Sequence, residues 1–207
     1  MKVSILDYGL GNLYSIVNAF QYCGQRVQIT NDEKEILRSD ILVLPGVGAF
    51  SAGMHCLKKS GLDRVIGRFA NTKQRLLGIC LGMQLLMSSS EEFGSSPGLG
   101  LIPGKVKLIT NIGKFNNSAK VPHIGWNNIQ VKRKHLLFNN IQNSAMYFLH
   151  SYCVVTDNDK NTLASVRYGD CEFSAVVAKG NIFGCQFHPE KSAENGLQII
   201  RNFLALV

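Results

Sequence analysis

The sequence RLLGICLGMQLLM, residues 75–87, places a cysteine between two glycines in an otherwise apolar run. The first five residues favour a buried strand, and the residues after Cys80 continue as an apolar helix. Cys80 therefore stands at the turn between the two elements. The spacing alone supports two interpretations equally, a small buried core residue and a nucleophile.

Glycines on both sides of Cys80, at Gly78 and Gly82, are typical of a nucleophile elbow. In this strained strand-to-helix turn, small neighbours are required because any side chain there would meet the strand or the following helix. The turn lifts the thiol above the sheet, at a helix N-terminus whose dipole favours the thiolate. A partner base elsewhere in the chain would decide between the two interpretations.

The best candidate for that base is His188, one of five histidines. A predicted strand over residues 181–187 runs into His188-Pro189-Glu190. Proline ends the strand and holds the residue before it extended, so His188 and Glu190 can share one side. The carboxylate can then orient the imidazole, as the third member of a triad does. The tripeptide is also typical of a plain turn, but together with the elbow it favours Cys80 as a nucleophile.

A nucleophile also needs an oxyanion hole, and the turn Pro45-Gly46-Val47-Gly48 is in a suitable place. It follows an apolar strand at the carboxyl edge, where parallel sheets place their sites. Its backbone N–H groups, with that of Leu81, could bind a tetrahedral oxyanion. The alternative is an ordinary strand-to-helix turn.

The rest of the chain predicts an α/β fold, because strands and helices alternate in its first half. Fully apolar strands indicate a parallel sheet covered on both faces. Strands are predicted at residues 2–6, 27–30, 41–44 and 75–79, and helical segments at 15–22, 32–37 and 62–71. Further strands are predicted at 105–109, 126–132, 146–149, 153–156, 162–167, 174–178 and 181–187, a final helix at 194–206, and a loop at 88–100. We therefore expect one domain, residues 1–207, with an open, mostly parallel or mixed sheet flanked by helices, and short antiparallel strands added in its second half.

Composition excludes several classes of function. The net charge is +8, but only residues 132–134 form a basic run and no aromatic RNA motif accompanies it, so no nucleic-acid partner is expected. A basic nucleic-acid-binding protein is the alternative of a different class. The six cysteines include no C-x-x-C pair, which argues against a zinc site and favours the reducing cytoplasm. No apolar stretch approaches the roughly 20 residues of a membrane span, so no membrane association is expected.

No cofactor is expected either, because the glycine pairs do not complete a nucleotide motif. Gly9-x-Gly11 and Gly46-x-Gly48 lack the third glycine of a dinucleotide fingerprint, and no G-K-[ST] occurs. No metal site is predicted.

Several motifs together identify a resemblance that covers most of the chain. GICLGMQ, with PGVG before it and QFHPEKS near the end, resembles the class I, or triad, glutamine amidotransferases. VPHIGWN (121–127) and YFLHSY (147–152), with DYGLGN (7–12) and GLGLIPGKV (98–106), are similar to the glutaminase subunits of imidazole glycerol phosphate synthases.

This resemblance implies a role for each motif residue. Cys80 would attack the side-chain amide of glutamine, His188 would transfer the proton and Glu190 would orient His188, so that a thioester is hydrolysed to glutamate and ammonia is released. Val47 and Leu81 would supply the oxyanion amides. The residues implied in substrate binding are Gly48, Gln84 and the segment His150, Ser151 and Tyr152.

The resemblance also implies a partner, because ammonia released into neutral water is mostly protonated and is then no longer nucleophilic. The implied partner is a (β/α)8-barrel cyclase, in a heterodimer that makes imidazole glycerol phosphate and aminoimidazole carboxamide ribotide for histidine biosynthesis. The residues implied at the interface are Asn12, His123, Trp126, Asn127 and Lys191. Without the resemblance, Trp126 would more often be a core residue and Lys191 a solvated surface charge.

Two stretches depart from the family pattern. No proline precedes the elbow in residues 73–78, and residues 107–109 lack an aromatic residue. Neither change touches the triad, but they leave open a paralogue that supplies ammonia to another barrel synthase, such as one that aminates a surface-polysaccharide sugar. A non-catalytic scaffold is a further alternative, against which the intact Cys80, His188 and Glu190 argue.

Overall fold

The first half of the chain forms the parallel sheet that its apolar strands predict. The computed structural model describes residues 1–113, 120–141 and 145–206, so the predicted domain 1–207 includes ten residues outside the described ranges. The parallel strands occur in the order β2-β1-β3-β4-β13. They are β1 Val3–Leu6, β2 Val27–Thr30, β3 Ile41–Leu44, β4 Arg75–Ile79 and β13 Ile182–Cys185.

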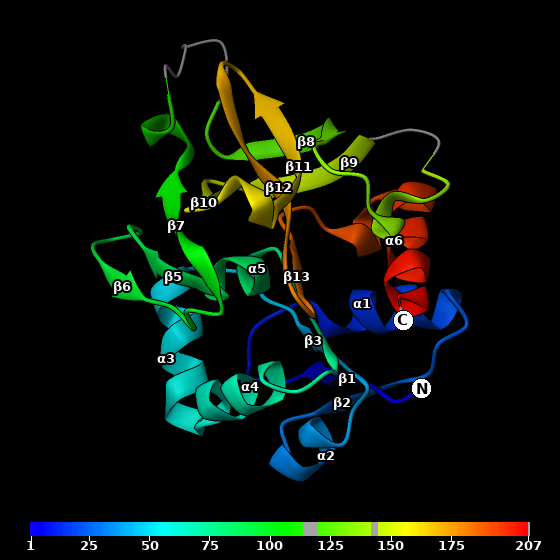
Figure 1. Ribbon diagram of the computed structural model, residues 1–207. Helices are drawn as coiled ribbons and strands as arrows, with labels where there is room; N and C mark the ends of the chain where they lie inside the picture. Colours follow the sequence, from blue (N-terminus) through cyan, green and yellow to red (C-terminus); the bar gives the residue numbers. More distant parts are fainter. Residues whose placement is uncertain (114–119, 142–144, 207) are drawn as a thin grey trace.

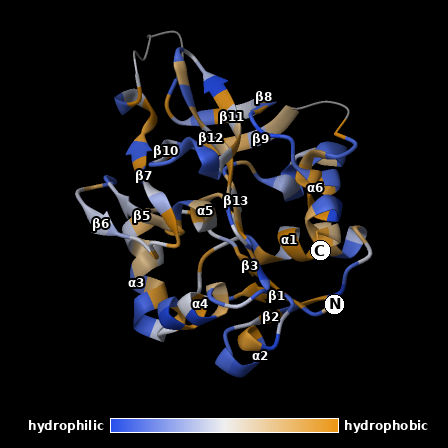
Figure 2. Ribbon diagram, viewed as in Figure 1, coloured by the Kyte–Doolittle hydropathy of each residue, from blue (hydrophilic) through white to orange (hydrophobic). Residues whose placement is uncertain are grey.

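Helices cover both faces of this sheet, as Figure 1 shows. They are α1 Leu13–Tyr22, α2 Glu33–Leu37, α3 Phe50–Ser60, α4 Leu62–Ala70, α5 Leu81–Leu85 and α6 Ala193–Ala205. Helices α1 and α6 pack on the face of the sheet that carries Val43. Helices α2, α3 and α4 pack on the opposite face, which carries the neighbouring residue Leu42. Side chains alternate along a strand, so a fully apolar strand supplies both cores at once. Figure 2 shows this as mostly hydrophobic strands between helices whose outer faces are hydrophilic.

The second half adds antiparallel strands to the same sheet, as predicted. They are β7 Ile102–Leu108, β8 His123–Val131, β9 Ala145–His150, β10 Tyr152–Thr156, β11 Thr162–Tyr168 and β12 Cys171–Lys179. Strand β12 pairs with β13 and so joins the two halves, while β11, β8 and β9 branch away from β12. Short 3₁₀ helices are η1 Ile109–Asn111, η2 Leu136–Phe138, η3 Asp159–Asn161 and η4 Pro189–Lys191. The prediction of a mixed α/β fold is confirmed.

The prediction of a loop over residues 88–100 is wrong. This segment contains most of β5 Met87–Ser90 and all of β6 Ser96–Pro97. Its serines carry no apolar alternation, and the strands exist because β5 pairs in parallel with β7 and antiparallel with β6. Helix α3 also has no counterpart among the predicted elements. It contains Gly53, a poor helix former, at a point where an added Cβ would lie only 3.2 Å from Leu85.

The order of the strands determines where a site can form. Strand β4 lies between β3 and β13, so the carboxyl ends of these three parallel strands share one edge. The turn after β3 begins at Pro45, the turn after β4 is Cys80, and the segment after β13 leads to His188. Among the described helices, none is both long and apolar enough to cross a membrane.

Candidate active site

Cys80 occupies the strained turn that its flanking glycines predict. Its φ of 54° and ψ of −109° lie in a region that costs a non-glycine residue about 1–3 kcal/mol. A Cβ on Gly78 would lie 2.7 Å from backbone atoms of Gly82 and Met83, and one on Gly82 would overlap the carbonyl oxygen of Leu44. Both glycines are therefore required by close backbone contact. The backbone N–H of Cys80 donates to the carbonyl of Cys185 at 2.8 Å, which ties the elbow to β13.

His188 and Glu190 lie together beside the elbow, both buried. Nδ1 of His188 and Oε1 of Glu190 are 2.7 Å apart, and the two side chains are 5% and 2% exposed. The backbone of His188 is fixed as well, because its N–H donates to the carbonyl of Tyr147 at 3.0 Å and its carbonyl accepts from Ser192 at 2.6 Å. The imidazole is thus held in one orientation by a carboxylate, as the sequence predicts.

The electrostatics of His188 favour its charged form. Burial alone would lower the pKa of this imidazole. The hydrogen bonds to Cys80 and Glu190, together with the charges of both groups, outweigh burial and raise the pKa from 6.5 to about 10. At neutral pH the ring of His188 therefore carries a positive charge.

We expect the ring of His188 to titrate near pH 10 in a histidine-resolved NMR titration. Because the pKa is raised on folding, the charge contributes stability that is fully present below pH 6.5 and is lost as the pH rises through about 10. Glu190→Gln removes one of the stabilising charges and lowers the midpoint. Glu194→Gln, at a carboxylate that is 69% exposed, leaves it unchanged. A midpoint near 6.5 in the unchanged chain would contradict this account.

A cavity of about 350 Å³ opens beside Cys80 and His188. Of the residues predicted to bind substrate or oxyanion, Val47, Gly48, Leu81, Gln84, Ser151 and Tyr152 line it. His150 is not among the lining residues; it is buried behind them, and its Nδ1 is 2.8 Å from the carbonyl oxygen of Tyr152. Glu92, Phe93 and Leu149 also line the cavity, although no sequence pattern predicts a role for them there.

Glu92 is the most informative of these additional residues. Its carboxylate is buried and accepts from the backbone N–H of Phe50 at 2.6 Å, at the start of α3. Among the described residues that line the cavity, it is the one that carries a carboxylate. The two adjacent acidic residues Glu91 and Glu92 are the only sequence signal, and they lie in a stretch that otherwise reads as a polar loop.

The turn after β3 is fixed next to the elbow. The hydroxyl of Tyr8 donates to the carbonyl of Pro45 at 2.8 Å, and Gly48 has a φ of +103°, which favours glycine. Val47 and Leu81 line the same cavity as Cys80, so the two predicted oxyanion amides belong to one site. Their role as an oxyanion hole stays a prediction.

The predicted interface residues differ in exposure. Asn12 caps the start of α1 and is exposed, Lys191 is exposed at the rim of the cavity, and Trp126 is 53% exposed rather than in the core. His123 is fully buried, so its side chain cannot itself contact another protein. It reaches toward the surface through the half-buried Asn127, whose Oδ1 lies 2.8 Å from Nε2 of His123.

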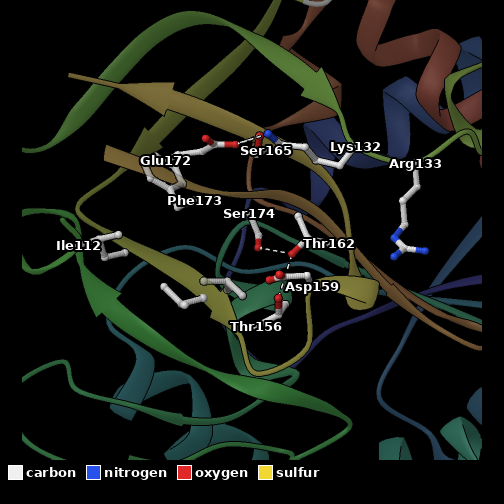
Figure 3. Close-up of a pocket in the computed structure, with 12 residues that line it drawn as sticks. Ile112, Lys132, Arg133, Thr156, Asp159, Thr162, Ser165, Glu172, Phe173 and Ser174 are labelled. Atoms are coloured by element: carbon white, nitrogen blue, oxygen red, sulfur yellow. Dashed lines mark hydrogen bonds and ion pairs between the residues drawn. The ribbon is translucent and has the colours of Figure 1, made fainter. Parts of the chain in front are cut away.

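Two larger cavities in the described structure contain none of the predicted site residues. One, of about 530 Å³, lies where β10 and β12 separate. Figure 3 shows its hydroxyl groups bonded to one another, as in the contacts of Thr162 with Thr156 and Ser174, and Lys132 paired with Glu172. The other, of about 660 Å³, lies beside Arg75 and Asn181. In the described ranges, no group of three or more His, Cys, Asp or Glu residues is arranged to bind a metal.

Comparisons with known proteins identify the family of this chain. The sequence model of the family "Glutamine amidotransferase class-I" matches residues 4–207. The "Imidazole glycerol phosphate synthase subunit HisH" of Geobacillus sp. (strain WCH70) is 45% identical over 99% of this chain and 97% of its own length. The protein of the same name from Methanosarcina barkeri is 49% identical over 98% of each chain.

Solved structures show the same fold. The "Structure of PurLQS from Thermotoga maritima" superposes with a TM-score of 0.74 over 98% of this chain and 97% of that chain, at 20% identity. The match over almost the entire sequence, and relatives of nearly equal length, place this chain in the class I glutamine amidotransferase family.

Proposed function

We propose that this chain is the glutaminase subunit of an imidazole glycerol phosphate synthase, which hydrolyses glutamine to glutamate and passes the ammonia to a cyclase subunit for histidine biosynthesis. The observation that carries the chemistry is the pair Cys80 and His188 in the wall of one cavity, with Glu190 hydrogen-bonded to His188. The pathway is supported by relatives of similar length that carry the name of this synthase subunit. These relatives do not favour the sugar-aminating alternative.

The proposed reaction uses the charged ring of His188. The thiolate of Cys80 attacks the side-chain carbonyl carbon of glutamine, and the backbone N–H groups of Val47 and Leu81 stabilise the oxyanion. The imidazolium of His188 gives its proton to the leaving nitrogen, so ammonia departs and a glutamyl thioester remains. His188 then removes a proton from water, which attacks the thioester. Glutamate leaves, and the thiolate and imidazolium are restored.

The cavity offers suitable groups for the other end of glutamine. The α-ammonium group needs an anionic partner, and the buried carboxylate of Glu92 lies in the cavity wall, fixed by the N–H of Phe50. Gln84, Ser151 and Tyr152 supply neutral polar groups around it. We assign substrate binding to these residues, and we place His150 behind them as a support for Tyr152.

Replacing Glu92 with glutamine is expected to raise the KM for glutamine about ten-fold with a smaller change in kcat, because a charged hydrogen bond to substrate is worth roughly 1.5–3 kcal/mol. Glu91→Gln is the matched control, since Glu91 lies next in the chain and pairs on the surface with Lys107. Steady-state kinetics of the assembled complex measure both. An equal rise in KM for both variants would count against a direct contact between Glu92 and substrate.

An exposed apolar strip beside the cavity is the proposed docking surface for the cyclase. It consists of Ile124, Trp126 and Leu149, which are 56%, 53% and 41% exposed. Ile124 is paired with Leu149 across β8 and β9, and Leu149 also lines the cavity. A partner seated there would cover apolar surface and the mouth of the site together, which would keep ammonia out of bulk water. We propose a (β/α)8-barrel subunit in a one-to-one heterodimer as this partner.

Trp126→Ala should weaken the complex about thirty-fold, the effect of removing one aromatic hot spot of roughly 2 kcal/mol. Isothermal titration of the cyclase subunit into the variant measures the change. Tyr22→Ala, at an aromatic residue that is 71% exposed at the end of α1, is expected to leave the affinity unchanged. If the cyclase subunit binds the Trp126→Ala variant and the unchanged chain with equal affinity, the strip is not part of the interface.

Reconstitution tests the proposed function as a whole. The chain is mixed with a cyclase subunit of imidazole glycerol phosphate synthase or with a sugar-aminating barrel synthase, and each mixture is supplied with glutamine and the substrate of its barrel. We expect glutamine-dependent product only with the cyclase. Product only with the sugar-aminating partner would overturn the histidine assignment. All six cysteines, each within the described ranges, are free thiols, which suits the cytoplasm that we propose as the site of action.

A further inference from the structure

Two buried histidines connect strand β8 with the wall of the active-site cavity. His123 and His150 are 0% and 7% exposed, and the register of β8 and β9 places them opposite each other. Nδ1 of His123 is 3.1 Å from Nε2 of His150, and Nδ1 of His150 is 2.8 Å from the carbonyl oxygen of Tyr152. The chemistry proposed above assigns no role to the ring of His123.

The direction of each hydrogen bond between Asn127 and Tyr152 follows from counting the protons on the two histidine rings. The carbonyl of Tyr152 can only accept, so Nδ1 of His150 carries a proton. Both rings are neutral, because burial lowers the pKa of His123, and burial with the adjacent His123 lowers that of His150 to about 3. A neutral ring has one proton, so Nε2 of His150 must accept from the Nδ1–H of His123.

The same count of protons determines the hydrogen bond between His123 and Asn127. The structure places Oδ1 of Asn127 2.8 Å from Nε2 of His123. Because this ring nitrogen carries no proton it can only accept, so we infer that the amide of Asn127 is turned over and its nitrogen donates. The two ends of a side-chain amide have the same shape, and the neutral ring selects the orientation in which the nitrogen faces it. Every contact from Asn127 to Tyr152 then has one defined donor.

The carbonyl of Tyr152 also positions Gln84. Nε2 of Gln84 donates to this carbonyl at 2.8 Å and to Oε1 of Gln186 at 3.1 Å. Both N–H groups of the Gln84 amide are then used, which leaves its Oε1 as the atom available to a ligand in the cavity that Gln84 lines. Gln186 in turn donates to Sγ of Cys80 at 3.8 Å.

We propose that His123 is a positioning residue for glutamine binding. By donating to His150 it holds the ring that fixes the Tyr152 carbonyl, and this carbonyl together with Gln186 sets which end of the Gln84 amide faces the substrate. The cavity wall therefore presents a hydrogen-bond acceptor to the amino or amide hydrogens of the ligand. The proposal rests on the proposed function for the identity of that ligand.

Kinetics of the assembled complex test this role with two substitutions at one position. His123→Phe keeps an aromatic ring between Phe148 and Tyr168, on which His123 stacks at 4.8 and 4.0 Å, but removes the donor. We expect the KM for glutamine to rise about ten-fold, as for the loss of a buried hydrogen bond, with kcat changed less than about two-fold. In His123→Asn the amide nitrogen can take the place of Nδ1, so we expect the KM to return most of the way to its value in the unchanged chain. His55→Phe, on the exposed face of α3, leaves the KM unchanged.

Two results would overturn the role of His123. One is an unchanged KM in the His123→Phe variant; the other is a KM in His123→Asn that is no better than in His123→Phe. A role limited to stability would lower the unfolding temperature and the amount of active complex without moving the KM. Isothermal titration of the cyclase subunit into each variant shows that its complex is assembled.

Nitrogen-15 NMR of the histidine rings tests the same chain of hydrogen bonds without any activity. We expect both His123 and His150 as neutral rings with the proton on Nδ1. A proton on Nε2 of His150 would reverse the central hydrogen bond and overturn the proposal. If the unchanged complex used no glutamine, the proposed function would fail, and the NMR result would still decide whether the two rings form this chain.

Discussion

Replacing Cys80 with alanine abolishes glutamine-dependent synthesis in the assembled complex, by about 10⁴-fold or more, as does removal of a nucleophile in other triad enzymes. Synthesis from added ammonium salt continues, because that reaction needs only the cyclase subunit. We expect the glutamine-dependent reaction to be lost because Cys80 is the cysteine that lines the cavity with His188. Product formation measured with glutamine and with ammonium separates the two reactions.

Cys56→Ala is the matched control for this result. Cys56 is half-buried on α3 and does not line the cavity, so both reactions should remain intact. Glutamine-dependent synthesis above about one per cent in the Cys80→Ala complex would contradict a thioester mechanism. Loss of binding to the cyclase subunit, measured by isothermal titration, would show that the substitution disrupts the complex rather than the chemistry.

Gly82→Ala should lower the free energy of unfolding by about 4 kcal/mol or more, an effect as large as severe packing conflicts produce. The added Cβ would overlap the carbonyl oxygen of Leu44 at the end of β3, and neither backbone segment can move freely, because β3 is paired with β4 on one side and β1 on the other. Chemical denaturation measures the change in the free energy of unfolding.

Gly67→Ala provides the comparison for this substitution. Gly67 lies in α4, and apart from its chain neighbours and the surrounding helix backbone, no atom would lie within 4 Å of an added Cβ. We expect this variant to be more stable by up to about 1 kcal/mol, because alanine favours a helix over glycine. A Gly82→Ala variant as stable as Gly67→Ala would show that the elbow tolerates a side chain, against the structure.

The elbow and the parallel half of the sheet could be predicted from the sequence because each rests on local rules. Fully apolar strands separated by helical segments specify a covered parallel sheet, and the glycines around Cys80 specify close backbone contact. The pairing of His188 with Glu190 could also be predicted, since proline fixes the backbone between them. In each case the relevant residues lie within a few positions of one another.

The remaining features depend on contacts between distant segments. Glu92 reaches the cavity only because β5 pairs with β7, which brings a polar stretch next to the start of α3. The contact between His123 and His150 depends on the register of β8 against β9. A sequence pattern does not specify such registers, so the buried support for the substrate wall could not be predicted. For the same reason, the prediction that His123 lies at an interface does not account for its fully buried side chain.

The central claim, that Cys80 carries the glutamyl group during glutamine hydrolysis, can be tested by trapping the intermediate. The assembled complex is mixed with glutamine, quenched in acid and digested, and the cysteine-containing peptides are examined by mass spectrometry. We predict a glutamyl thioester on the peptide that contains Cys80 and on none of the peptides with the other five cysteines. A glutamyl group on another cysteine, or turnover of glutamine without any modification of Cys80 under conditions that preserve thioesters, would contradict the account.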